Sequence, residues 1–341
     1  METVWFWLVA VMITAYVVLD GYDLGTGIIH LGVARNDAER RTVLGTIGPY
    51  WDANEVWLLA AGGTLYLAFP ELYSASFSGF YLPLMVVLWL LILRGIAIEF
   101  RSHLEDSLWQ PVWDVVFAGA SALLAIFFGA ALGNVLRGVP LDASRQFFLP
   151  LWTNFGVTGA VGILDWYTVT IGVCAYLALT QHGALWVAYK AGGEVRKRAL
   201  HVAGLAWWGV AVFCALATVT TLAVQPHVGE NLARYPAGFV FPALGVAGLV
   251  AAWWFRRAGQ DLKAFLGSCA FLVGMLTSAV FGVYPYVLPS NGDPALGLTI
   301  QNTAAPAYGL GIGLYWWIPG MLLVTGYFTY VYRHHRGRVP S

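Results

Sequence analysis

The chain has 341 residues, of which 59% are hydrophobic and only 11% are charged, and its acidic and basic side chains balance to a net charge of zero. Soluble domains average about 25% charged residues, so the composition excludes a soluble globular protein, and we expect no nucleic-acid partner. The three cysteines lie singly inside apolar runs, without the spacing that disulfides or metal sites require. The sequence therefore predicts an integral membrane protein.

Nine apolar segments follow one another, and most have the ~20 residues that a transmembrane helix needs. They lie near 4–30, 52–72, 77–100, 113–136, 156–180, 200–224, 238–255, 262–288 and 308–332. The second is short and carries acids, so a half-span is the alternative to a full crossing. The first has no basic leader and no small-residue cleavage site, so we interpret it as a retained span rather than a signal peptide.

The basic residues fall mainly on one side of the membrane in this arrangement. If all nine segments cross, 14 of the 18 Lys and Arg residues lie on one face, three lie on the other and one lies inside a span. The positive-inside rule makes the basic face cytoplasmic. We therefore predict an all-α polytopic protein with nine transmembrane helices, its N-terminus outside and its C-terminus cytoplasmic.

Ionisable side chains inside a span cost about 2.5–3.5 kcal/mol on insertion scales, which makes each of them a candidate functional residue. The candidates, with one neighbouring amide, are Asp20 and Asp23 in the first segment, Asp52, Asn54 and Glu55 in the second, Arg94 and Glu99 in the third, and Asp165 midway along the fifth. In the predicted orientation the first three groups share the cytoplasmic side, because short connections keep successive helices together. Carboxylates that are linked by hydrogen bonds and can shift in pKa suit a proton path. Asp165 is a secondary candidate, since its segment cannot be placed relative to the others.

Structural roles compete with this interpretation. Asp52 could cap its helix after Gly48 and Pro49, with Glu55 completing a capping box. The other structural pairings are Asp20 or Asp23 with Arg35, Arg40 or Arg41 of the following loop, and Arg94 with Glu99. Capping and proton transfer by Asp52 are compatible with each other.

The seven histidines all fall at span ends or in loops on this segment count, so we expect the chain to hold no haem iron and no other metal. His182 is the best exception. The many tryptophans near span ends indicate interfacial anchoring, and a groove for a structural quinone or lipid is the alternative.

Three stretches together resemble subunit II of cytochrome bd-type quinol oxidases. They are LDGYDLG at 19–25, RNDAERR at 35–41 and IGPYWDANEVWL at 47–58. The likeness continues through AGG at 61–63, GN at 133–134, QHGA at 181–184 and PYVLPS at 285–290. It covers essentially the whole chain and is densest in the first 140 residues.

The resemblance implies a single membrane domain over 1–341, with a first bundle to about 140 and the remaining spans over about 150–335. It implies two four-helix bundles plus one peripheral helix, in the inner membrane of a bacterium. The partner would be subunit I, which carries haem b and haem d, oxidises quinol and reduces oxygen, and small single-span subunits are further candidate partners. The proton-path acids of the family would fall on Asp20, Asp23, Asp52 and Glu99.

Departures from the family pattern are Ala53, where glycine is common, and Asn302, which aligns with an acid in some members. Two alternatives to the proton-supplying subunit stay open. One is a purely structural partner whose acids only cap and pair. The other is a secondary transporter with helices broken at glycine and proline.

Overall fold

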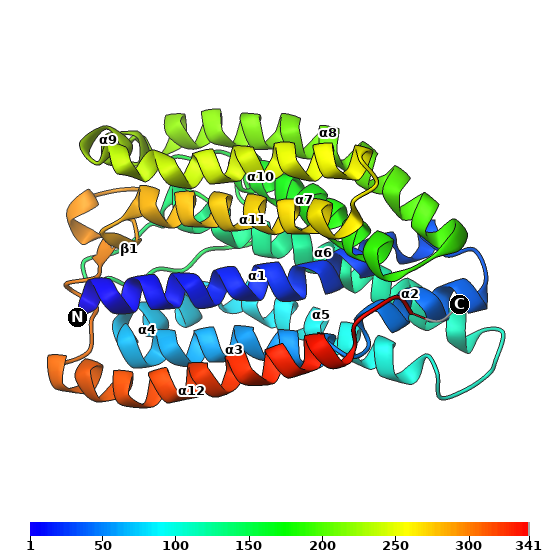
Figure 1. The fold of residues 1–341 in the computed structure, drawn as a ribbon. Coiled ribbons are helices and arrows are strands. Elements are labelled where there is room, and N and C mark those ends of the chain that lie inside the picture. The colour runs from blue at the N-terminus through cyan, green and yellow to red at the C-terminus, as the bar shows by residue number, and fades with distance from the viewer. Residues whose placement is uncertain (340–341) are drawn as a thin grey trace.

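Long helices that lie roughly parallel make up most of the computed structural model, which describes residues 1–339 (Figure 1). The long helices are α1 (Glu2–Val33), α3 (Trp51–Ala68), α5 (Tyr81–Phe100), α6 (Trp109–Arg137), α7 (Trp166–Lys190), α8 (Gly193–Val224), α10 (Val240–Arg257), α11 (Asp261–Val283) and α12 (Ala307–His334). Shorter elements connect them: α2 (Asp37–Ile47), α4 (Pro70–Gly79), α9 (Pro226–Arg234), and the 3-10 turns η1 (Pro236–Phe239) and η2 (Pro294–Leu296).

Eight helices in the described part of the chain are long and apolar enough to cross a membrane, and α3 is the one long helix that is not among them. The first turn and a half of α3 carries Asp52, Asn54 and Glu55, which lower its mean hydropathy. Its 18 residues nevertheless extend for about 27 Å at 1.5 Å per residue, close to the thickness of a bilayer core.

Several predicted boundaries are wrong: among them, α7 ends at Lys190 rather than at 180, and α8 begins at Gly193 rather than at 200. The fifth segment was expected at 156–180, but α7 begins only at Trp166, because Asp165 caps it by accepting hydrogen bonds from the Tyr167 and Thr168 N–H groups. The second was expected to reach residue 72, but α3 ends at Ala68 and Pro70 starts a new helix. The eighth was expected to reach residue 288, but α11 ends at Val283.

A small antiparallel sheet follows α11, which the all-helical prediction did not include. Strands β1 (Tyr286–Leu288) and β2 (Leu298–Thr299) pair with each other. Next to them, Ser290 forms an isolated bridge with Val139, just after the end of α6. The loop after α11 therefore lies at the end of the bundle where α6 ends, and it contacts the residues that follow α6.

Helix α1 lies inside the bundle, between α11 on one side and α3 on the other (Figure 1). Its close approach to α7 depends on glycine, since a Cβ on Gly25 would lie 2.0 Å from the Leu179 carbonyl oxygen. A Cβ on Gly183 would likewise lie 2.2 Å from the Gly25 carbonyl carbon. Small residues thus let the two backbones touch, as they do in many membrane bundles.

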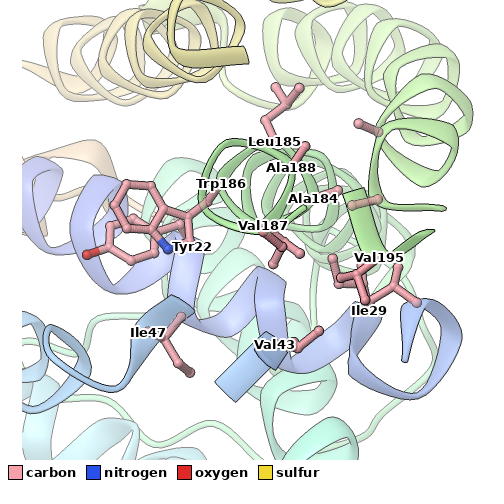
Figure 2. Close-up of a cluster of buried hydrophobic side chains, with 14 of the residues drawn as sticks. Tyr22, Ile29, Val43, Ile47, Ala184, Leu185, Trp186, Val187, Ala188 and Val195 are labelled. Atoms are coloured by element: carbon pink, nitrogen blue, oxygen red, sulfur yellow. The ribbon is translucent and has the colours of Figure 1, made fainter. Parts of the chain in front are cut away.

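Apolar side chains fill the space beside this contact. Figure 2 shows Tyr22 of α1 and Trp186 of α7 in one buried cluster, and their rings stack with centroids 4.2 Å apart. The two chain ends lie at opposite ends of the bundle (Figure 1). The cluster lies toward the end that holds the C-terminus, where the polar site described next is also found.

Candidate functional site

A buried ion pair joins α1 to α5. Arg94 donates two hydrogen bonds to Asp20, of 2.8 Å from Nη1 to Oδ2 and 2.6 Å from Nη2 to Oδ1, and both side chains are fully buried. Arg94 Nη2 also lies 3.3 Å from Glu55 Oε2 on α3. Glu55 is 25% exposed, so this group of three charges runs from the surface of the chain to its interior.

A second buried pair joins α1 to α3 next to the first. Asn54 Nδ2 donates to Asp23 Oδ2 and to the Tyr22 hydroxyl, at 2.7 Å in both cases. Asp20 and Asp23 share a face of α1 because they are three residues apart. Asp23 Oδ1 and Asn54 Oδ1 are buried and have no hydrogen-bond partner among the described residues. Asp23 therefore keeps a free oxygen in the interior.

Asp52 and Glu99 do not join this cluster. Both side chains are exposed, and within residues 1–339 neither makes a side-chain hydrogen bond or ion pair. Asp52 lies in the first turn of α3 but does not cap it: the N-cap is Tyr50, which makes no side-chain cap bond. The predicted cap and capping box are thus wrong, because the N-cap lies two residues earlier, at Tyr50, and Glu55 turns to Arg94 instead.

The other predicted structural pairings are also wrong. Arg94 bonds to Asp20 rather than to Glu99. The arginines of the loop after α1 do not reach Asp20 or Asp23: Arg40 pairs with Asp114 on α6, and Arg41 pairs with Asp37 and Glu105.

Asp114 is the centre of a buried charge cluster that the sequence analysis missed. It accepts hydrogen bonds from Arg101 Nε at 2.6 Å and from Arg40 Nη1 at 2.9 Å, and its Oδ1 lies 2.6 Å from His30 Nε2. Arg101 Nη2 also bonds to Asp37 at 2.8 Å, and this bond lowers the pKa of the Asp37 carboxyl. The sequence signal that could have indicated this cluster is Asp114 itself, a lone acid in the first turns of the apolar segment that forms α6.

Asp165 lies apart from the candidate site, at the other end of the bundle. It is not in the middle of a span, as expected, but at the start of α7, where its side chain is ion-paired with the buried Arg137 at the end of α6. Arg137 also donates to Asn134 Oδ1 at 2.7 Å and to the Gly162 carbonyl oxygen at 3.0 Å. These bonds give Asp165 a structural role, because they fasten the loop before α7 to α6.

His182 contradicts the prediction that every histidine lies at a span end or in a loop, since it is fully buried within α7. Both ring nitrogens are engaged: Nδ1 lies 2.7 Å from Ser268 Oγ, and Nε2 lies 2.9 Å from the Val18 carbonyl oxygen. The ring stacks on Phe265 with centroids 4.8 Å apart. A histidine held in this way has no free nitrogen to offer a metal.

Tyrosines surround the Asp23 side of the cluster, and the sequence analysis did not single them out. The hydroxyl oxygens of Tyr22 and Tyr332 are 2.6 Å apart, which links α1 to the end of α12. The Tyr50 hydroxyl donates to the His335 carbonyl oxygen and lies 3.2 Å from Lys190 Nζ. The only local signal in the sequence was the position of Tyr22 between the two acids of α1.

A shallow apolar groove lies between α3 and α12. Its volume is about 650 Å³, and its lining includes Gly63, Leu67, Gly313, Trp316 and Trp317. A Cβ on Gly63 would meet nothing within 4 Å, whereas one on Gly313 would lie 2.9 Å from Trp5 and 3.0 Å from Leu67.

Comparisons with known proteins agree on one family. Residues 1–335 match the profile described as cytochrome bd terminal oxidase subunit II. The cytochrome bd ubiquinol oxidase subunit 2 of Bacillus subtilis is 31% identical over 92% of this chain and 89% of its own length. The cytochrome bd-I ubiquinol oxidase subunit 2 of Escherichia coli K12 is 28% identical over 99% of this chain and 95% of its own length. The bd oxidase structure from Geobacillus thermodenitrificans has a similar fold, with a TM-score of 0.76 at 16% identity over 97% of both chains.

Proposed function

Because this chain belongs to the family of subunit II of cytochrome bd terminal oxidases, we propose that it supplies protons from the cytoplasm to the oxygen-reducing haem of its partner, subunit I. The complex is a quinol oxidase, a terminal oxidase of a respiratory chain. In this proposal the chain holds no haem, and haem b and haem d both lie in subunit I. The engaged nitrogens of His182 support the first part, since they leave no ligand inside α7.

The proposed membrane arrangement has nine crossings, with α3 as the ninth. The length of α3 supports a full crossing, and so do the chain ends, which lie at opposite ends of the bundle (Figure 1). An odd number of crossings places the two termini on opposite sides. The excess of Lys and Arg then makes the C-terminal side cytoplasmic, in the inner membrane of a bacterium.

The observation that carries the proton proposal is the set of carboxylates that meet inside the bundle. Glu55, Asp20 and Asp23 come from two helices: Arg94 donates hydrogen bonds to Asp20 and Glu55, and next to this group Asn54 donates to Asp23. Burying charged groups is costly unless they are paired, so a purely structural design would use fewer of them. A buried Asp23 with one unpartnered oxygen has room for a proton.

We place the face toward subunit I on α3 and α5. Asp52 and Glu99 are exposed on these helices, beside exposed apolar side chains such as Leu59 and Trp89. Carboxylates that face lipid are costly, whereas a protein partner can offer them hydrogen bonds. Asp52 and Glu99 would then pass protons between the subunits, and the partly exposed Glu55 would be the cytoplasmic entrance to the buried acids.

The groove between α3 and α12 is the proposed place for a structural quinone or lipid tail, since its lining is apolar and includes two tryptophans. Helix α12 is exposed over most of its length, with Trp316, Leu322 and Leu323 all more than two-thirds exposed. Lipid or a small single-span subunit would cover this helix in the membrane.

Purification and one isosteric variant test the proposal. A tag on this chain should bring down a haem-bearing subunit with bd-type absorption, whereas a colourless chain that is stable alone would favour a transporter. Asp23→Asn keeps the shape of the side chain and removes its titration. We expect it to leave the haem spectrum unchanged and to slow oxygen consumption about a hundredfold, the scale of losing a proton-transfer group. Unchanged oxygen consumption would favour the purely structural subunit.

A further inference from the structure

Two tyrosine hydroxyls connect Asp23 with the end of α12. The Tyr22 and Tyr332 oxygens are 2.6 Å apart, which is a short hydrogen bond between two hydroxyl groups. On its other side the Tyr22 oxygen accepts a hydrogen bond from Asn54 Nδ2, and the same nitrogen donates to Asp23 Oδ2. Since Asn54 acts toward Tyr22 as a donor, the Tyr22 hydroxyl keeps its own hydrogen, and either tyrosine can be the donor in the bond between them.

Exposure changes in one direction along this chain of groups. Asp23 and Tyr22 are each 1% exposed, Tyr332 is half-buried, and the residues from 333 to 338 that follow it are exposed. The route therefore begins next to solvent at the C-terminal end of the bundle. It ends at the buried carboxylate without passing Glu55, Arg94 or Asp20.

The surrounding side chains hold both tyrosines in place. Figure 2 shows the Tyr22 ring against Trp186, with its hydroxyl directed away from the apolar side chains of the cluster. The Tyr332 ring lies 4.8 Å from that of Tyr50, measured between centroids. The Tyr50 hydroxyl is held by Lys190 and by the His335 carbonyl oxygen. Phenylalanine would fill the apolar space around Tyr22 equally well, so packing does not account for its hydroxyl.

We propose that Tyr332 and Tyr22 form a proton relay to Asp23, a second entrance beside the one at Glu55. The inference rests on the proposed function. A cytoplasmic proton binds the Tyr332 oxygen, Tyr332 passes its own proton to Tyr22, and Tyr22 releases a proton to Asp23. The Tyr22 and Asp23 oxygens each lie 2.7 Å from the Asn54 nitrogen, so they are at most 5.4 Å apart, a separation that a single bridging water molecule can span. Both tyrosines end neutral, Asp23 gains one proton, and no electron moves.

The test uses the assembled two-subunit oxidase with Tyr22→Phe, Tyr332→Phe and the double variant. Proton uptake during oxygen reduction is followed with a pH indicator and normalised to haem content. Tyr167→Phe is the matched control, since it removes a buried hydroxyl bonded to Thr221 at 2.8 Å, near the start of α7 and far from the relay. Asp23→Asn is the reference for loss of the common acceptor.

We expect each single variant to slow proton uptake at least about threefold, but less than the roughly hundredfold loss of a direct proton donor, because the entrance at Glu55 remains. The double variant should be no slower than the slower single variant, since the two groups act in series. The solvent deuterium isotope effect on the rate of proton uptake should also change. Loss of packing alone would not change this isotope effect.

Three results would count against the relay. Normal uptake in Tyr22→Phe and Tyr332→Phe with slow uptake in Asp23→Asn would overturn the relay and leave the proposed function standing. Normal proton uptake in Tyr22→Phe, Tyr332→Phe and Asp23→Asn would overturn both the relay and the proposed function. If Tyr167→Phe slows proton uptake as much as the relay variants do, the loss of any buried hydroxyl group slows uptake and the relay is not needed to explain it. If Tyr22→Phe fails to assemble, Tyr332→Phe alone tests the relay, because Tyr332 is half-buried and its loss disturbs packing less.

Discussion

Arg94 of α5 donates two hydrogen bonds, of 2.8 and 2.6 Å, to Asp20 of α1, and both side chains are fully buried. Such a pair is costly to break from one side, because the remaining charge is left buried without its partner. It fixes the distance between the two helices at the depth where Asp23 and Asn54 also meet.

The first prediction concerns this ion pair. Arg94→Gln should lower the free energy of unfolding by about 3–5 kcal/mol, because Asp20 then stays buried without a counter-charge. Thermal unfolding of the purified complex measures the loss. Lys197→Gln is the control, since Lys197 pairs with Glu194 on an exposed surface, where an ion pair contributes about 0–1 kcal/mol. Equal stability of the two variants would contradict the account.

The second prediction concerns the contact between α1 and α7. Gly25→Ala places a methyl group 2.0 Å from the Leu179 carbonyl oxygen, so the helices must move apart. We expect a loss of about 1–3 kcal/mol in unfolding free energy, or failure to assemble with the partner. Gly32→Ala on the same helix meets nothing within 4 Å and should leave both quantities unchanged. A stable Gly25→Ala complex would show that the helices are not in contact there.

The third prediction is a pH dependence at α2, the short helix that follows α1. Hydrogen bonds from Arg101 and Arg41 lower the pKa of Asp37, and bonds from the Arg35 backbone and Arg198 lower the pKa of Glu39. A lowered pKa in the folded state means that these carboxylates stabilise the fold above their unfolded pKa values, near 4. That contribution is lost as the pH falls from about 4 through the folded pKa values.

Thermal unfolding between neutral pH and about pH 3 measures this dependence. Asp37→Asn should flatten the acid limb of the curve, whereas Asp293→Asn, in the loop on the opposite side of the bundle, should not. An unchanged acid limb in Asp37→Asn would place the titration elsewhere.

The fourth prediction separates the two roles considered for Asp52. Because its side chain does not cap α3, Asp52→Ala and Asp52→Asn should assemble equally well, with only a small loss from the helix dipole, at most about 1 kcal/mol. Both should slow oxygen consumption to the same degree, since both remove titration at the proposed face toward subunit I. Poor assembly of the Ala variant alone would restore the capping role.

Much of the architecture could be predicted from the sequence because its signals are local. Apolar runs gave the helices, and Asp20 and Asp23 could be placed on one face because they are three residues apart. The contact of Gly25 with α7 fits the spacing of small residues in α1. Glu55, Asn54 and Arg94, which are candidate residues in the sequence, do meet Asp20 or Asp23 or their partners in the interior, whereas Asp52 and Glu99 do not.

The rest depended on helix rotation and on distant contacts. Asp52 and Glu55 both lie in the first turns of α3, yet only Glu55 turns inward to Arg94, and no pattern in the sequence decides which. Tyr332 lies 310 residues from Tyr22, so nothing near either residue indicated the bond between them. Asp165 was misplaced because the polar loop before α7 contains apolar residues that extend the hydrophobic run.

The central claim is that protons for oxygen reduction pass through the buried carboxylates of this chain. The most direct measurement is the rate of proton uptake when the fully reduced oxidase reacts once with oxygen, compared between the wild type and Asp23→Asn. In Asp23→Asn, electron transfer to oxygen should begin at the normal rate while proton uptake slows about a hundredfold. Proton uptake at the wild-type rate, in an Asp23→Asn complex with a normal haem spectrum, would contradict it.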